Sequence, residues 1–494
     1  MNVEAQDGHL ATPLSRNVWL APIKVGVILA CVLLLCLLNS VGILPRVPPA
    51  ALLLTIMSAG FLFANGRGTQ DLIHPVRVFG VIWCFCLALA SLHLLPMNSN
   101  WSPLMWTCVL TGLISFVGGF WIANEFVSNR QTNPDLEFPE AFRQQTLLSQ
   151  SRTLVVATFC IAVGISVLSY EYHLIGGIPI LSDNPDATRM VLFGFVGEGD
   201  PRFDSIFIKI IHLFVEFSKY GVFLAFIVLI QEGRKTKKVV LSCLFLVLLG
   251  TLAYGSQAGR TFIINIAVTC IVLFHYLRRR IKLVELGAVA MILFLFLGLF
   301  GSWRTRVSES APLLQRVRDA STFPEGQFWD GVVFGYLTLT ESFEVFDRLT
   351  VDLPTVQKSS GTLFYAFHRF IPRTNITAIT ADLYSALFIT PTFLGEFYAD
   401  YGYIGVLLGP LILGCAYAWA YSQRGSRNAI YWVYVRAMLV SMVVFFPYVN
   451  LFSLYVTWIS DLMFMYLISC FLNARKARYH RLLVDSSGQA PFHI

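Results

Sequence analysis

The segment "HRFIPR" brings an imidazole and two guanidiniums together within an otherwise apolar sequence: His368, Arg369 and Arg373. A guanidinium binds phosphate through a planar pair of N–H donors. The pKa of an imidazole beside such cations is expected to be lowered, so that the ring is neutral and can accept a proton. Pro372 restricts the backbone between the two arginines. The segment therefore favours anion binding beside a proton acceptor, and a solvated surface cluster is the alternative.

Two carboxylates in "LGEFYADYG" are a second set of candidates. Glu396 and Asp400 are four residues apart and share one face if the segment is helical. Neighbouring acids raise each other's pKa, which suits a general base. The same pair could instead complement the dipole of a helix N-terminus. As catalytic bases we rank Glu396 first, Asp400 second and His368 third.

Other arginines lie where polar and apolar segments meet. Arg260 ends the short turn "YGSQAGR" at the start of an apolar segment, where free backbone N–H groups favour an anion. It could also simply extend from the membrane edge toward water. Arg304 and Arg306 follow another apolar segment in "GSWRTR", and Arg189 ends "LSDNPDATR". Arginine suits a lipid phosphate or diphosphate better than lysine does, because of its planar fork.

The elements that must position these residues are apolar. Of 494 residues, 56% are hydrophobic and 13% are charged, whereas soluble domains have roughly a quarter charged residues. Mean hydropathy is +0.66. Continuous apolar segments of about 20 residues are long enough to cross a bilayer as helices and do not alternate as barrel strands do. The sequence predicts an all-α polytopic membrane protein with about twelve transmembrane helices, near 22–44, 47–65, 75–96, 103–126, 152–172, 206–230, 238–254, 261–277, 283–302, 402–422, 430–450 and 453–473.

Basic residues alternate between the connections. "RKTKK", "RRRIK", "RGSR" and "ARKARYHR" fall on one set of loops, while "PMNSNW" on the other set has no lysine or arginine. The positive-inside rule then places both termini in the cytoplasm and the candidate residues on the outer side. We expect residues 1–302 to hold nine helices and the outer loop 173–205. Residues 303–401 form a folded outer cap between helices 9 and 10, 402–473 three more helices, and 474–494 a cytoplasmic tail.

Several classes of protein are excluded or disfavoured. The sequence contains no HExxH zinc motif, no Walker loop and no dinucleotide-binding glycine pattern. Its cysteines fall inside apolar segments, which disfavours a metal site or a disulfide framework. The net charge of +7 is divided among short clusters between apolar segments, which does not favour nucleic-acid binding. We therefore expect neither a metal nor another cofactor.

Four segments carry a resemblance to a known family: "GGIPILSDNPDATR", "GSQAGRTFIINIA", "HRFIPR" and "TPTFLGEFYADYGYIGVLLGPLILG". Together they resemble the Wzy-type oligosaccharide repeat-unit polymerases, which make bacterial O-antigen, capsule and related polysaccharides. The similarity covers residues 150–470. It implies a class C glycosyltransferase-like architecture, related to the O-antigen ligases, in the bacterial inner membrane.

The resemblance also implies an activity. Such enzymes transfer a growing glycan from undecaprenyl diphosphate to a second carrier-linked repeat unit on the periplasmic side, and need neither nucleotide sugar nor metal. Membrane lipid and a chain-length regulator are the other partners that we expect. By position, the residues that would hold the diphosphate or the glycan are Arg189, Arg260, Arg304, Arg306, Arg369, Arg373 and Tyr398.

Two alternatives remain open. An O-antigen ligase would use the same donor but a lipid A core as acceptor. A flippase or other transporter of a lipid-linked or anionic substrate would require broken helices with charges near the bilayer midplane. The residues that could provide such charges are Glu216, Lys219 and Glu285. The concentration of arginine at the outer edge favours the polymerase.

Overall fold

The computed structural model describes residues 48–63, 71–94, 101–128, 149–192, 206–231, 235–307, 326–352, 391–423, 428–449 and 458–473. Within these ranges every regular element is helical. The α-helices are α2 (Pro49–Phe63), α3 (Pro75–Ala90), α4 (Pro103–Ser128), α6 (Gln150–Ile175), α7 (Pro185–Leu192), α8 (Ile206–His212), α9 (Phe217–Ile230), α10 (Lys237–Gly255), α11 (Arg260–Leu277), α12 (Leu283–Val307), α14 (Gln327–Asp352), α17 (Leu394–Ser422) and α18 (Ala429–Phe445). The 3₁₀ helices are η1 (Pro179–Leu181) and η2 (Leu213–Glu216), and a further apolar helix is Trp458–Asn473.

The prediction of a helical multi-pass membrane protein is confirmed. Seven helices are long and apolar enough to cross a membrane: Pro103–Phe126, Gln150–Ile175, Ile210–Ile230, Lys237–Gly255, Arg260–Leu277, Leu283–Arg304 and Leu394–Ser422. Four shorter apolar helices lie at the predicted positions near 47–65, 75–96, 430–450 and 453–473. The predicted span 22–44 and the tail 474–494 lie outside the described residues. The total of twelve spans therefore stays a prediction.

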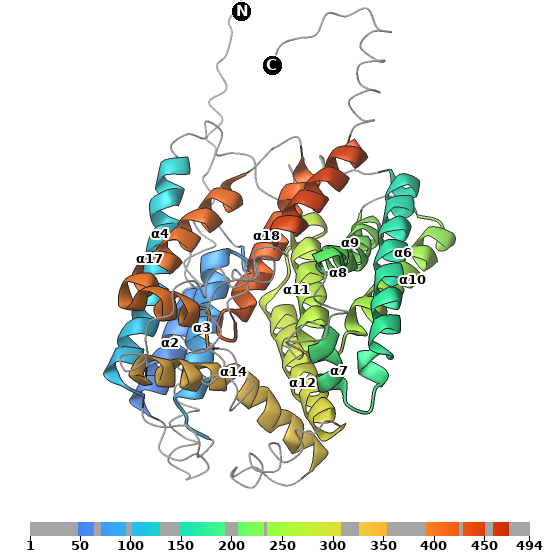
Figure 1. Ribbon diagram of the computed structural model, residues 1–494. Coiled ribbons are helices and arrows are strands. Elements are labelled where there is room, and N and C mark those ends of the chain that lie inside the picture. The colour runs from blue at the N-terminus through green and yellow to red at the C-terminus, as the bar shows by residue number, and fades with distance from the viewer. Residues whose placement is uncertain are drawn as a thin grey trace, which may run out of the picture.

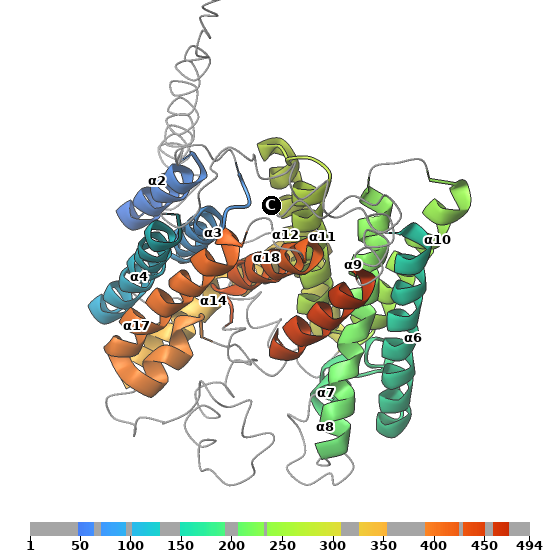
Figure 2. The ribbon, with the colours of Figure 1, turned by 90° about the horizontal axis from the view of Figure 1, so that it is seen from above.

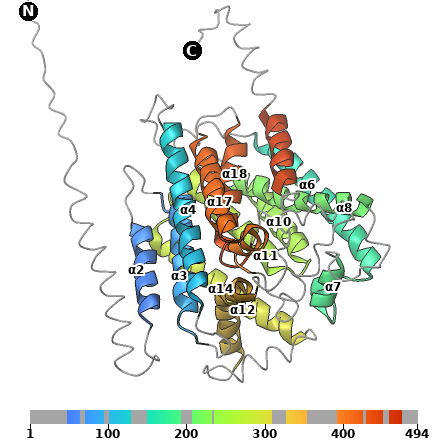
Figure 3. The same ribbon diagram turned by 60° about the vertical axis from the view of Figure 1, so that its left-hand side comes forward.

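The helices form two groups with a third between them (Figure 2). One group contains α2, α3, α4 and α17, and the other contains α6, α9 and α10, with close packing of α4 on α17 and of α6 on α9. Between the groups, α11 packs on α18, and α12 lies beside them. Figure 3 shows α2, α3 and α4 running side by side. The bundle thus has an interior to which helices from both groups contribute.

Glycines allow the closest helix approaches. A Cβ on Gly119 of α4 would lie 2.1 Å from the Leu411 carbonyl oxygen of α17, and one on Gly414 of α17 would lie 2.1 Å from the Phe116 carbonyl oxygen. Helices in a lipid environment associate through such small-residue contacts rather than through the hydrophobic effect.

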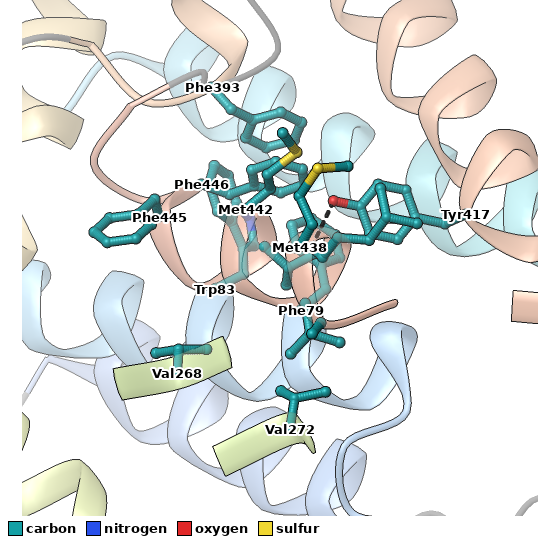
Figure 4. Packing of buried hydrophobic residues seen from close by; sticks show 14 of the residues in the cluster. Phe79, Trp83, Val268, Val272, Phe393, Tyr417, Met438, Met442, Phe445 and Phe446 are labelled. Carbon is teal, nitrogen blue, oxygen red and sulfur yellow. Dashed lines mark hydrogen bonds between the residues drawn. The ribbon is translucent and has the colours of Figure 1, made fainter. Parts of the chain in front are cut away.

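An aromatic cluster fills the interior where the groups meet (Figure 4). Phe393 stacks on Phe446 with ring centroids 4.3 Å apart, and Trp83 of α3 meets Phe393 edge-on at 5.2 Å. The hydroxyl of Tyr417 on α17 donates to the Leu439 carbonyl of α18 at 2.8 Å. These contacts fix the start of α17 against the segment that follows α18.

Helix ends predicted to share the inner side do meet. Asp71, just before α3, accepts hydrogen bonds from Tyr276 at the end of α11 (3.1 Å) and from Tyr421 at the end of α17 (2.6 Å). His275 Nε2 lies 3.0 Å from Asp71 Oδ1. Arg436, in the middle of α18, donates to the Tyr421 carbonyl at 2.6 Å. This arrangement agrees with the predicted order of spans, and which side faces the cytoplasm stays a prediction.

The helix α14 belongs to the predicted cap, 303–401, and lies across the opposite end of the bundle (Figure 1). It packs on α12 so closely that a Cβ on Gly298 would lie 1.9 Å from the Gly331 carbonyl oxygen. Its Asp347 accepts hydrogen bonds from the backbone and hydroxyl of Ser102, at 2.9 and 2.7 Å, just before α4. Thus α14 is fastened to two helices that are far apart in the sequence.

Two helix boundaries differ from the predicted spans. Helix α12 continues to Val307, so Arg304 lies on its last turns instead of in a loop. Helix α17 begins at Leu394 and contains a non-helical Gly402, with φ 62°. A positive φ is costly for residues with a side chain and is readily adopted by glycine. Glu396 and Asp400 therefore belong to a helical segment that precedes this kink.

Candidate functional site

The turn before α11 positions Arg260 and joins two of the segments noted in the sequence. The Ser256 carbonyl accepts a hydrogen bond from the Ile180 backbone at 3.2 Å, and the Ser256 hydroxyl lies 2.5 Å from that of Tyr172. Ala258 adopts a positive φ of 57°, and Gly259 then precedes the first turn of α11. The segment "GGIPIL" thus packs on the turn "YGSQAGR", as the order of spans requires.

The guanidinium of Arg260 is enclosed by α12, α14 and the turn after α18. Its Nη1 donates to the Thr338 hydroxyl of α14 at 2.9 Å. Its carbon Cζ lies 5.9 Å from the ring centre of Phe334 and 5.8 Å from that of Tyr448. A Cβ on Gly301 of α12 would lie 2.8 Å from Nη1. Only a glycine therefore leaves room for this guanidinium without a shift.

Three arginines influence the ionisation of Tyr448. It lies in the turn after α18, and its carbonyl accepts a hydrogen bond from the Ser342 hydroxyl of α14 at 3.2 Å. Burial raises the pKa of Tyr448, but the charge of Arg260, its hydrogen bond to Tyr448, and the charges of Arg189 and Arg304 together lower that pKa below its ordinary value. Guanidiniums from α7, α11 and α12 are thus close enough to stabilise one negative charge.

The turn before α11 also contacts the side chain of Arg304. Its Nη1 lies 3.4 Å from the Ala258 carbonyl oxygen, two residues before Arg260. The structure thereby brings together three of the predicted anion-binding residues, Arg189, Arg260 and Arg304. The side chain of Arg306 on α12 lies outside the described part of the chain, as do His368, Arg369 and Arg373.

Glu341 is a candidate that the sequence interpretation missed. It lies one turn after Thr338 on α14, and the residue is 5% exposed. Its Oε2 is buried without a hydrogen-bond partner among the described residues. Burial raises the pKa of Glu341 to about 8, opposed by the charge of Arg348 and assisted by that of Glu344. Such a carboxyl can exchange a proton near neutral pH.

Two neighbouring acids of α14, Glu344 and Asp347, have structural partners. Glu344 Oε2 accepts a hydrogen bond from the Trp101 indole at 3.1 Å, and Asp347 binds Ser102. The signal for Glu341 was present in "TESFEVFD", where acids recur every three residues in an otherwise apolar segment. Without the contacts of α14, nothing distinguished Glu341 from its two neighbours.

The two carboxylates of α17 lie at the same end of the bundle. Phe393, just before α17, donates its backbone N–H to the Phe446 carbonyl at 2.9 Å, two residues before Tyr448. Glu396 follows in the first turn of α17 and is half-buried, and Asp400 follows one turn later and is buried. Their assignment as bases stays a prediction.

Tyr398 packs between two helices. Its hydroxyl donates to the Thr350 carbonyl of α14 at 3.4 Å, and its ring meets Phe346 edge-on at 5.9 Å. It is 6% exposed, so its faces are covered by protein. Its predicted role in glycan binding stays a prediction and would require this packing to open.

Among the described residues, no three or more His, Cys, Asp or Glu side chains are grouped as a metal ion would require. The site is therefore built from guanidiniums, hydroxyls and carboxyls. No known protein family, curated protein or solved structure matches this chain.

Proposed function

We propose that the protein polymerises undecaprenyl-diphosphate-linked oligosaccharide repeat units at the outer face of a bacterial inner membrane. The observation that carries this proposal is the convergence of Arg189, Arg260 and Arg304 on Tyr448 at the end of the bundle. A diphosphate attached to a lipid would meet these cations at the membrane edge, with its hydrocarbon tail in the bilayer. The resemblance of the sequence segments to Wzy-type polymerases supports the same assignment.

The arginines would act on the leaving group. When the acceptor sugar hydroxyl attacks C1 of the donor glycan, a new C–O bond forms and the bond from C1 to the diphosphate oxygen breaks. Negative charge then develops on the carrier diphosphate, and preorganised N–H donors stabilise it. Arg260 is positioned for this because Thr338, Phe334 and Gly301 fix its guanidinium before any substrate arrives.

The proton of the attacking hydroxyl must pass to a base. Glu396, Asp400 and His368 are the bases proposed from the sequence, and Glu341 joins them because of its burial and its place one turn from Thr338. At neutral pH most Glu341 carboxyls carry a proton, because the pKa is about 8. Glu341 would then accept the proton of the attacking hydroxyl in the minority of molecules in which its carboxyl is ionised. In its protonated form it would instead donate a proton to the leaving oxygen of the diphosphate.

The experiment that tests this proposal is the length of surface glycan in a strain that lacks the gene. If the protein is a polymerase, single repeat units reach the surface and long polymer is absent. If it is a ligase, carrier-linked polymer accumulates instead. A strain complemented with the wild-type gene should recover the full ladder, and an unchanged ladder in the deletion strain would contradict both enzyme assignments.

One observation favours transport as a second candidate. The sixth predicted span changes from α-helix to the 3₁₀ helix η2 (Leu213–Glu216) and back, within the continuous helical segment Ile210–Ile230. Lys219 follows within the membrane segment and pairs with Glu216 and Asp461 at 2.6 and 2.7 Å. A 3₁₀ stretch within a helix often marks a functional hinge, and ionisable side chains within a membrane segment often mark a transport pathway. Loss of every outer-face repeat unit in the deletion strain would favour this candidate.

A further inference from the structure

A second cluster of ionisable groups lies inside the bundle and contains none of the arginines of the candidate site. Lys219 on α9 places its ammonium between two carboxylates, 2.6 Å from Glu216 Oε2 and 2.7 Å from Asp461 Oδ2. Lys219 and Asp461 are 3% and 4% exposed. Asp461 comes from the helix Trp458–Asn473, so the cluster joins two helices that are distant in the sequence.

Tyrosines from three helices, α9, α10 and α18, bond to these carboxylates. The Tyr254 hydroxyl of α10 lies 3.0 and 2.9 Å from the two oxygens of Glu216. The hydroxyls of Tyr220 on α9 and Tyr434 on α18 both bond to Asp461. The charges that act on Asp461 are those of Lys219 and Glu216. The cluster therefore contains two carboxylates, one ammonium and three phenols.

The charges of this cluster do not balance. With both carboxylates ionised and Lys219 protonated, the sum is one negative charge inside a membrane segment. An uncompensated charge there is costly, and a buried ionisable group neutralises by taking up a proton instead. The tyrosine hydroxyls can accept as well as donate a hydrogen bond, so a protonated carboxyl keeps its partners.

A neighbouring pair leads from this cluster toward the outer side. His212 is one turn before Glu216, and its Nδ1 lies 2.8 Å from Glu171 Oε1. The His212 side chain is 31% exposed, whereas Glu171 is buried. The Glu171 Oε2 has no hydrogen-bond partner within the described ranges. A partly exposed imidazole bonded to a buried carboxyl thus lies one helical turn before Glu216.

We propose that Glu216, Lys219 and Asp461 form a proton-binding site inside the membrane, in which the two carboxylates share one exchangeable proton. Lys219 holds the carboxylates together, and His212 with Glu171 connects them to the outer side. This site shares no residue with the arginine site and does not depend on the proposed polymerase activity. It would serve either function, since it lets the protein respond to the proton concentration at the outer face.

Charge balance makes the test specific. Removing either carboxylate leaves one acid and one ammonium, a neutral pair that needs no proton. Infrared difference spectra would be recorded on purified protein in lipid nanodiscs stepped from high to low pH, in a Glu171→Gln, Glu341→Gln background that removes two other buried carboxyls. In the background protein, acidification is expected to raise a C=O band at the higher frequency of a carboxyl shielded from water, distinct from the band of the exposed acids. It should be lost in both Asp461→Asn and Glu216→Gln.

Two further variants sharpen the result. Lys219→Met leaves two unpaired acids and should increase the band about twofold, since each acid then takes its own proton. Glu285→Gln, which changes an exposed carboxylate paired with Arg279, should leave it unchanged. If the Lys219→Met protein does not accumulate in the membrane, Asp461→Asn and Glu216→Gln still show whether the band comes from this cluster.

The proposal is overturned if no such band titrates in the background protein or if the band persists in either amide variant. Sodium is a separate arm of the experiment. If sodium chloride added at constant pH removes the band, the site takes up a metal cation in place of the proton, and the assignment to a proton is wrong.

Discussion

At the scale of the residue, the position of Arg260 depends on a few specific neighbours. Thr338 accepts one of its N–H groups, Phe334 and Tyr448 lie against it, and Gly301 leaves it space. A guanidinium held in this way loses little freedom when it binds an anion, so more of the interaction contributes to the reaction. The function of Arg260 should therefore depend on the planar shape of its guanidinium as well as on its charge.

We expect Arg260→Lys to impair polymerisation nearly as much as Arg260→Ala. Lysine keeps the charge but cannot reproduce the planar fork, and loss of one preorganised donor costs on the order of 10²-fold in rate. The measurement is the length of surface glycan at matched protein levels in the membrane. Arg279→Ala, an exposed arginine paired with Glu285, is the control and should keep the full ladder. A full ladder from Arg260→Lys would show that charge alone suffices.

The raised pKa of Glu341 predicts that the stability of the protein depends on pH. Its pKa is raised from 4.5 to about 8 in the folded protein. The folded state therefore holds a proton that the unfolded state releases, and the resulting stability is fully present below pH 4.5 and is lost as the pH rises toward about 8.

Thermal melting in detergent from pH 5 to pH 9 should show this difference. The melting temperature of the wild type should fall with pH more steeply than that of Glu341→Gln, which cannot ionise. The exposed Glu285→Gln should retain the wild-type slope. Parallel curves for wild type and Glu341→Gln would mean that Glu341 ionises as readily in the folded protein as in the unfolded chain.

At the scale of the element, the apolar helices could be predicted from the sequence and the cap could not. Long continuous apolar segments have one stable conformation in lipid, so α4, α6 and α10 follow directly from hydropathy. Helix α14 was expected only as part of a folded cap, because its acids interrupt the apolar pattern. Those acids instead bind Trp101 and Ser102 from another part of the chain, and such partners are not encoded locally.

The packing of α12 on α14 gives a prediction with a matched control on the same helix. A Cβ on Gly301 would lie 2.6 Å from a ring carbon of Phe334 and 2.8 Å from Arg260 Nη1, so both side chains must move. A misplacement of about 1 Å can cost on the order of 10²-fold in activity. We expect Gly301→Ala to shorten the glycan while the protein still accumulates.

Gly287 lies near the other end of α12, and a Cβ there would have no atom within 4 Å. Gly287→Ala should therefore leave glycan length unchanged. Equal glycan lengths from the two alanine variants would show that the space beside Arg260 is not required.

At the scale of the whole molecule, the order of spans explains why segments far apart in the sequence meet. Residues of α7, α11, α12 and the turn after α18 were all expected on one side, and Arg189, Arg260, Arg304 and Tyr448 do come together there. The sequence could place arginines on a side but could not select among them. That selection depends on helix packing, in particular on the glycines of α12.

The predicted orientation can be tested by cysteine labelling. Leu181 beside α7 is 77% exposed and should face outward, whereas Val284 at the start of α12 is 83% exposed and should face the cytoplasm. In spheroplasts, a membrane-impermeant maleimide should label Leu181→Cys and should label Val284→Cys only after lysis. The described native cysteines are buried or half-buried, so their background should be low. The reverse pattern would contradict the orientation and the outer placement of the arginines.

The central claim is that the three converging arginines hold a lipid-linked diphosphate. Native mass spectrometry of the purified protein with undecaprenyl diphosphate measures this most directly, without knowledge of the sugars. We expect one bound lipid on the wild type and on Arg279→Ala, and at least tenfold weaker binding to Arg260→Ala and Arg304→Ala, since each loses charge-assisted hydrogen bonds. Equal binding of undecaprenyl diphosphate to all four proteins would contradict the account.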